Sequence, residues 1–183
     1  MDTFAAAAPD TRPGPSAAAA RGIWKVIALF ERIPHSFIAL LARFSIAVTF
    51  WLSGQTKIEG LVLDPIGRTA ELGLPRMSGN AVELFRSEYA LPLISPELAA
   101  VTAAVAEHVF PLLLLIGLAS RFSAFALLLM TLVIQVFVYP GAFATHGMWA
   151  VAMLYLMARG PGVVSLDHLI TNRSRARARC RTW

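Results

Sequence analysis

The chain has 183 residues, of which 57% are hydrophobic and 15% charged, with a mean hydropathy of +0.63. Soluble domains carry about 25% charged residues, so this chain has too few charges to coat a water-exposed surface. Its single cysteine, Cys180, excludes a disulfide scaffold, a CxxC redox pair and a thiolate metal cage. The composition therefore predicts a membrane protein of one domain.

The first residues predict two short regions that precede the membrane. Residues 1–20 are rich in Ala and Pro, which predicts a disordered tail. In residues 21–35, apolar side chains recur at near-helical spacing between basic ones, namely Ile23, Trp24, Ile27 and Phe30. We expect this second region to form a helix that lies on the membrane surface.

Four segments are apolar and long enough to cross a bilayer, which takes about 20 residues. They cover residues 36–54, 98–118, 122–139 and 143–158. Because four such segments in one short chain can hardly all form a soluble core, we predict an all-α membrane protein. Its centre is a bundle of four transmembrane helices within residues 36–170.

The loop between the first two spans, residues 55–97, is long enough to be structured. Asn80 followed by Glu83 is typical of a helix N-terminus, with Asn as the cap. Phe85 and Tyr89 then fall on one helical face. We expect a short helix here that lies on the outer membrane surface.

Basic residues predict the orientation of the bundle. Eleven lie on the side of the two termini: Arg12, Arg21, Lys25, Arg32, Arg121, Arg159, Arg173, Arg175, Arg177, Arg179 and Arg181. Four lie on the opposite side: Lys57, Arg68, Arg76 and Arg86. The positive-inside rule then predicts a membrane protein with both termini in the cytoplasm.

The basic tail, residues 171–183, has two interpretations. Its arginines (Arg173, Arg175, Arg177, Arg179 and Arg181) either bind anionic lipid headgroups or only anchor the topology. Aromatic residues do not alternate with these arginines, so we do not expect nucleic-acid binding.

Short motifs follow the predicted spans in a fixed order. They are Arg43 to Ala47 and Ser53 to Lys57, Glu107-His108 and Ala119-Ser120-Arg121, Gln135 to Pro140, Thr145-His146 with Trp149, and Arg159 to Gly162 with Ser165-Leu166-Asp167. Together, over about residues 36–170, these motifs resemble the DoxX family. Residues 85–93 resemble one branch of that family.

The resemblance implies a four-helix inner-membrane protein of poorly defined activity. Some relatives are associated with quinone-linked sulfur oxidation and membrane oxidoreductase complexes, and others with metal-handling or peptide-modifying genes. Relatives that exchange thiols carry cysteine pairs. This chain has none, so that chemistry is not expected of it.

Polar residues inside the spans predict the functional region, because ionisable groups in a membrane are costly unless they meet partners or water. We expect Arg43 to face Glu107, either as a structural ion pair or as part of a ligand or proton site. The candidate pocket opens outward and comprises Arg43, Phe50, Lys57, Glu107, His108, Gln135, His146 and Trp149. In the alternative interpretation, His108 is only a bundle histidine, and His146 and Trp149 only anchor the interface.

The sequence leaves several functions open. The first is a subunit or accessory of a redox-linked membrane system, with a pocket for a quinone-like or other small lipophilic molecule. The alternatives are a non-enzymatic anchor or assembly partner for another protein, such as one of a redox or metal-handling system, and a small transporter acting as a homo-oligomer. A metal site is not expected, because the spacing of Glu107, His108 and His146 is awkward for three ligands. The sequence contains no recognisable nucleophile set, phosphate loop or cofactor motif, which leaves enzymatic activity undecided.

Overall fold

The structure is a computed structural model and describes residues 15–64 and 66–180. The chain divides into two units, Met1–Pro34 and His35–Trp183, which are described separately. The second unit contains four helices long and apolar enough to cross a membrane. This confirms the prediction of an all-α membrane bundle.

The four spans lie close to the residues predicted for them. They are α2 (His35–Gln55), α4 (Pro96–Ile116), α5 (Ser120–Val133) with its π-helical continuation η2 (Ile134–Val138), and α6 (Phe143–Arg159) after the 3-10 turn η3 (Pro140–Ala142). Ser95 begins α4 by accepting a hydrogen bond from the backbone N–H of Leu98. Gly117 ends α4 in the left-handed conformation, at φ 74°.

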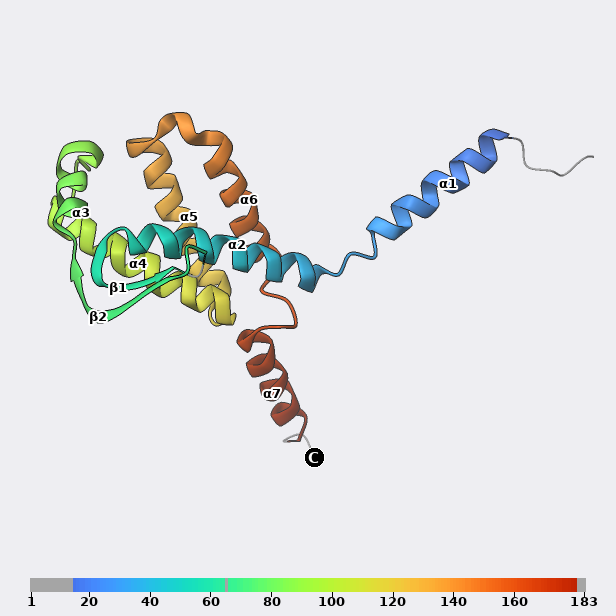
Figure 1. The fold of residues 1–183 in the computed structure, drawn as a ribbon. Helices are drawn as coiled ribbons and strands as arrows, with labels where there is room; N and C mark the ends of the chain where they lie inside the picture. The colour runs from blue at the N-terminus through green and yellow to red at the C-terminus, as the bar shows by residue number, and fades with distance from the viewer. Residues whose placement is uncertain (1–14, 65, 181–183) are drawn as a thin grey trace, which may run out of the picture. The chain divides into compact units, whose positions relative to one another are not determined.

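Helix α2 packs mainly against α4, and α5 packs against α6 (Figure 1). The buried core between them contains Phe50, Leu114, Leu127 and Met153. Large apolar side chains remain exposed around the outside of the bundle. Such a surface suits lipid, which solvates apolar side chains without cost.

The segment between α2 and α4 contains a β-hairpin that was not predicted. Strand β1 (Ile58–Asp64) pairs antiparallel with β2 (Thr69–Met77), and the register shifts between Glu59 and Leu61. The hairpin folds back beside α2, because the indole N–H of Trp51 donates to the carbonyl of Leu63 over 2.7 Å.

The expected short helix follows the hairpin. It is α3 (Gly79–Leu84), which continues into the π-helical turn η1 (Phe85–Tyr89). Its N-cap is Ser78 rather than Asn80, and Ala90 ends η1 with a left-handed φ of 37°. The expected position of this helix on the membrane surface stays a prediction.

Two helices frame the bundle in the sequence. In the first unit, α1 (Pro15–Phe30) begins before residue 21, because Ala17 to Ala20 favour a helix and proline is tolerated at its first position. Residues 1–14, the first part of the predicted disordered tail, lie outside the described residues. In the second unit, α7 (Leu166–Cys180) extends a helix through most of the basic tail, and Arg181 lies outside the described residues.

Candidate functional site

A buried ion pair joins the end of α2 to the middle of α4. The ammonium Nζ of Lys57 lies 2.7 Å from Oε2 of Glu107, and the two residues are 5% and 2% exposed. The helices approach closely here because Gly54 has no side chain: a Cβ on it would lie 2.8 Å from the ring of His108. Gly54 thus allows Lys57 to reach the carboxylate.

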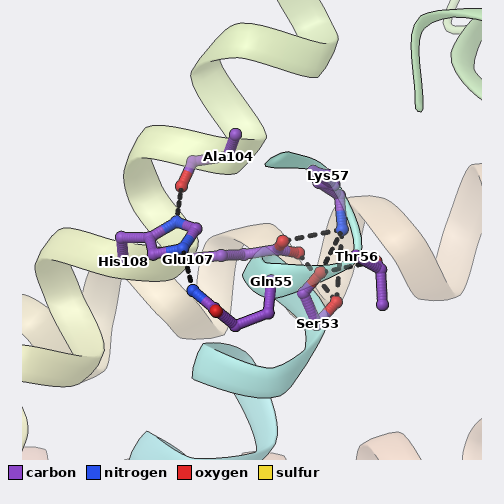
Figure 2. A network of polar contacts seen from close by, with 7 residues as sticks. All are labelled: Ser53, Gln55, Thr56, Lys57, Ala104, Glu107 and His108. Atoms are coloured by element: carbon purple, nitrogen blue, oxygen red, sulfur yellow. Dashed lines mark hydrogen bonds and ion pairs between the residues drawn. The ribbon is translucent and has the colours of Figure 1, made fainter. Parts of the chain in front are cut away.

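Ser53 completes this cluster (Figure 2). Its hydroxyl donates to Oε1 of Glu107 over 3.2 Å. The ammonium of Lys57 in turn donates to the carbonyl and the hydroxyl of Ser53, each over 3.2 Å. Each charge is therefore partnered, as burial in an apolar bundle requires.

Arg43 does not belong to this cluster, and its expected contact with Glu107 is wrong. It precedes Gly54 by eleven residues, which is about 16 Å along a helix. At that level α4 ends, and the carbonyls of its last turn lack helical partners. The guanidinium donates to the carbonyls of Leu114 and Leu115 over 2.7 and 2.6 Å.

The same guanidinium also holds the segment after α6. It donates to the carbonyls of Val164 and Pro161 over 2.6 and 3.2 Å. Nearby, the carboxylate of Asp167 accepts from the backbone N–H groups of Ala119 and Ser120, which begin α5. This end of the bundle is thus closed by structural hydrogen bonds.

His108 takes part in a second structural network (Figure 2). Its Nδ1 lies 2.6 Å from the carbonyl of Ala104, which can only accept, so Nδ1 carries the proton. Its Nε2 lies 2.9 Å from the amide nitrogen of Gln55, whose oxygen accepts from the backbone N–H of Leu63. His108 therefore ties the hairpin to α4, and it does not line the cavity described next.

A cavity of about 330 Å³ lies between α2, α4, α5, α6 and η1. Five of the eight predicted pocket residues line it: Phe50, Lys57, Glu107, His146 and Trp149. Phe50 and Trp149 form one wall, with ring centroids 5.7 Å apart. The structure thus joins the ion pair to an aromatic chamber from which Arg43 and His108 are absent.

Gln135 acts on this cavity through His146. The Nδ1 of His146 lies 2.7 Å from the amide oxygen of Gln135, which accepts, so Nδ1 is the protonated nitrogen. Gln135 is itself oriented, because its amide nitrogen donates to the carbonyl of Pro140 over 2.6 Å. A neutral His146 then keeps a lone pair on Nε2, for which the described residues supply no hydrogen bond.

The cavity residues outside the predicted pocket include Ser53, Tyr89 and Tyr139. The hydroxyl of Tyr139 donates to Glu88 over 2.7 Å, and its ring lies 5.9 Å from that of Tyr89. The hydrogen bond to Glu88 raises the pKa of Tyr139, and burial raises the pKa of Tyr89. Spacing on one predicted helix face marked Tyr89, but nothing in the sequence paired it with Tyr139.

Within residues 15–64 and 66–180, no three His, Cys, Asp or Glu side chains are placed to hold a metal ion. Glu107 is paired with Lys57, and His108 is turned into its own network. The cavity is thus defined by one ion pair, one histidine and aromatic walls.

The family comparison bears on the same part of the chain. A family model described as DoxX matches residues 38–140, which is more than half of the chain. The match includes α2, α4, α5 and the cavity residues they carry. Neither a curated protein nor a solved structure matches the chain. The chain therefore belongs to the DoxX family.

Proposed function

We propose that this DoxX-family membrane protein binds a small lipophilic, quinone-like molecule, as a subunit or accessory of a redox-linked membrane system. The observation that supports this most is the cavity of about 330 Å³, in which a buried ion pair and a histidine are combined with aromatic walls. Ligand sites are mostly apolar chambers of about 300 Å³ or more with a few fixed polar groups.

The charges of the cavity favour a neutral ligand. Lys57 and Glu107 neutralise one another, so a charged molecule entering the cavity would lack a free counter-ion there. A flat ring can lie against Phe50 and Trp149, and its oxygen atoms can be hydrogen-bonded at two places. A ligand oxygen at one end can accept from Lys57 in place of the hydroxyl of Ser53, and Nε2 of His146 can accept a hydroxyl proton at the other.

The test begins with the natural ligand. The full chain, purified with native lipids, should release a quinone-like or other small lipophilic molecule that mass spectrometry identifies. A short-chain benzoquinone then serves as the probe in a binding titration. The variant Ala106→Leu should weaken its binding on the order of tenfold, because the added side chain fills the cavity and leaves its polar groups intact.

Ala144→Leu is the matched control, since Ala144 lies outside this cavity on an exposed part of α6. It should bind the benzoquinone as the unmodified chain does. The proposal would be wrong if Ala106→Leu bound the benzoquinone as tightly as the unmodified chain. It would also be wrong if the unmodified chain showed no saturable binding.

We also propose that the protein lies in the bacterial inner membrane with both termini in the cytoplasm, and that residues 36–170 form its membrane domain. The eleven-to-four distribution of basic residues supports this orientation. Reporter fusions after Trp183 should be active in the cytoplasm. Fusions that are active only in the periplasm would reverse the orientation.

A second candidate function, assembly with another protein, is favoured by the hairpin. Leu72 and Leu74 on β2 are 85% and 81% exposed, and the outer edge of β2 is unpaired among the described residues, whereas β1 is the strand that contacts the spanning helix α2. Unpaired backbone groups are costly against lipid, so such an edge favours a protein neighbour. A photo-crosslinker at Leu72 should then yield a protein adduct. One at Leu132, on the exposed face of α5, should yield a lipid adduct.

The mass of the adduct separates a second copy from another protein. A product of twice the chain mass supports a homo-oligomer, and any other protein mass supports an accessory role. Lipid adducts at both positions would exclude the hairpin as an interface.

A further inference from the structure

The segment Phe85–Leu91 forms part of the cavity wall, although none of its residues belongs to the pocket predicted from the sequence. Three of its side chains line the cavity: Phe85, Tyr89 and Leu91. Val138 and Tyr139, at the end of η2, line the facing part. We call this the outer end of the bundle, following the predicted orientation. The ion pair of Lys57 and Glu107 lines another part of the same cavity.

One side of the segment is fixed to α4. The ring of Phe85 is buried against Ala99 and Ala100. Arg86 donates to the carboxylate of Glu97, at the start of α4, over 2.6 Å. This ion pair is exposed and adds little, so the buried ring of Phe85 is what fixes this side.

The other side is held by much less. The hydrogen bond from Tyr139 to Glu88 joins the segment to η2 and its following turn. The edge contact between the rings of Tyr89 and Tyr139 accompanies it. Tyr139 and Glu88 are both exposed, so water can compete for the hydrogen bond between them.

The backbone on both sides departs from the α-helix at this place. The segment contains the π-helical turn η1 followed by the left-handed Ala90, and η2 facing it is also π-helical. A left-handed conformation is strained for a residue with a side chain, and π-helical turns occur frequently at functional sites. Such a backbone can rearrange more readily than a regular helix.

We propose that Phe85–Leu91 is a lid over the outer end of the cavity, latched by the hydrogen bond between Tyr139 and Glu88. Its use as an entrance for a lipophilic ligand rests on the proposed function. The opening of the lid does not rest on the proposed function, because it can be measured as access to the cavity without any ligand. The lid turns on its α4 side, where Phe85 and Arg86 stay in place, and releases Tyr89 from Tyr139.

The test measures how fast a cysteine in the cavity reacts with a charged, membrane-impermeant thiol reagent. The full chain carries Cys180→Ser and Ala106→Cys and is held in lipid nanodiscs, so that both faces are accessible. Adding Tyr139→Phe, or separately Glu88→Gln, should raise the rate on the order of tenfold, as expected for a weakened charge-assisted hydrogen bond. The two changes together should raise it no further than the larger single effect, because they act on one bond.

Tyr155→Phe is the matched control, since the hydroxyl of Tyr155 bonds His35 at the opposite end of the bundle. It should leave the rate unchanged. A second control places the cysteine at Asn80, on the exposed surface of α3, where no latch variant should alter the rate.

Unchanged rates in both latch variants would overturn the lid, and so would an equal increase at Asn80, which indicates general loosening. If the rates rise but no quinone binds, the lid stands and the proposed ligand falls. If quinone binds but the rates do not change, the ligand stands and the lid falls.

Discussion

The ammonium of Lys57 and the carboxylate of Glu107 lie 2.7 Å apart, and both side chains are almost completely buried. Lys57 follows the last turn of α2, whereas Glu107 lies at the middle of α4. The first predicted span thus ends level with the centre of the second. Helices α2 and α4 each have 21 residues, but α2 ends at this level, and the cavity lies beside the first half of α4.

The first prediction concerns the charge balance of this pair. Glu107→Gln should lower stability by about 3–5 kcal/mol, because it leaves the ammonium of Lys57 buried without a counter-charge. Lys57→Met should cost a similar amount. Combined, the two changes should cost clearly less than their sum, as measured by thermal or denaturant unfolding in detergent.

Variants at Glu107 and Arg43, which are not in contact, provide the comparison. Arg43→Gln and Glu107→Gln should add within about 0.5 kcal/mol, because the two side chains share no partner. Non-additivity in that pair, with additivity between Lys57 and Glu107, would contradict the structure at this site.

The spans could be predicted from the sequence because hydropathy depends on composition alone. The sequence could not predict which polar groups meet. By helical spacing, Arg43 and Lys57 fall on one stripe of the first predicted span and its continuation, and either could have faced Glu107. The choice depends on how far α2 slides along α4, which the tight contact between Gly54 and His108 sets.

The hairpin was missed for a different reason. Its strands contain Gly60, Gly73 and Pro75, residues that are uncommon inside strands. Gly60 has a left-handed φ of 84°, and a Cβ on it would lie 2.6 Å from the carbonyl oxygen of Leu74. This pattern therefore indicated a loop, although β1 and β2 pair on both sides of the register shift.

A second prediction concerns Arg43, whose guanidinium contacts four carbonyl groups at once. Arg43→Lys keeps the charge but lacks the planar fork, so it should lose at least two of these bonds. We expect a loss of about 3 kcal/mol or more, at about 1.5–3 kcal/mol for each bond to a charged group. Thermal unfolding measures it, with the exposed Arg173→Lys as a control that should change little.

Protease cleavage gives a local measure of the same change. The segment 160–165 should be cut faster in Arg43→Lys, because Arg43 holds the carbonyls of Pro161 and Val164. Equal stability and equal cleavage in the Arg43→Lys variant would show that the charge alone is sufficient.

The third prediction is a pH dependence. The hydrogen bond to Glu88 raises the pKa of Tyr139, because its phenolate would form beside a carboxylate. The contribution of this bond to stability should therefore be present below the ordinary tyrosine pKa of about 10 and be lost as pH rises through the raised value. The ultraviolet titration of the parent minus that of Tyr139→Phe should show a phenol that ionises above that ordinary pKa.

Glu88→Gln serves as the control, because it removes the carboxylate and keeps the phenol. In that variant the difference titration should move down toward the ordinary value. A phenol of Tyr139 that ionises at or below about pH 10 in the parent would mean that the latch is absent in the membrane protein.

The last prediction compares two glycines inside spanning helices. Replacing glycine by alanine in a helix ordinarily stabilises it by up to about 1 kcal/mol, and Gly147→Ala in α6 should do so, because its Cβ would meet the ring of Phe143 at an ordinary 3.8 Å. Gly54→Ala should instead destabilise the protein by about 1–3 kcal/mol, because its Cβ would lie 2.8 Å from the ring of His108. That ring cannot move aside easily, since it is held by Gln55 and by the carbonyl of Ala104. Unfolding of both variants in the same detergent measures the difference, and a gain in stability from both would show that α2 and α4 are not in close contact at Gly54.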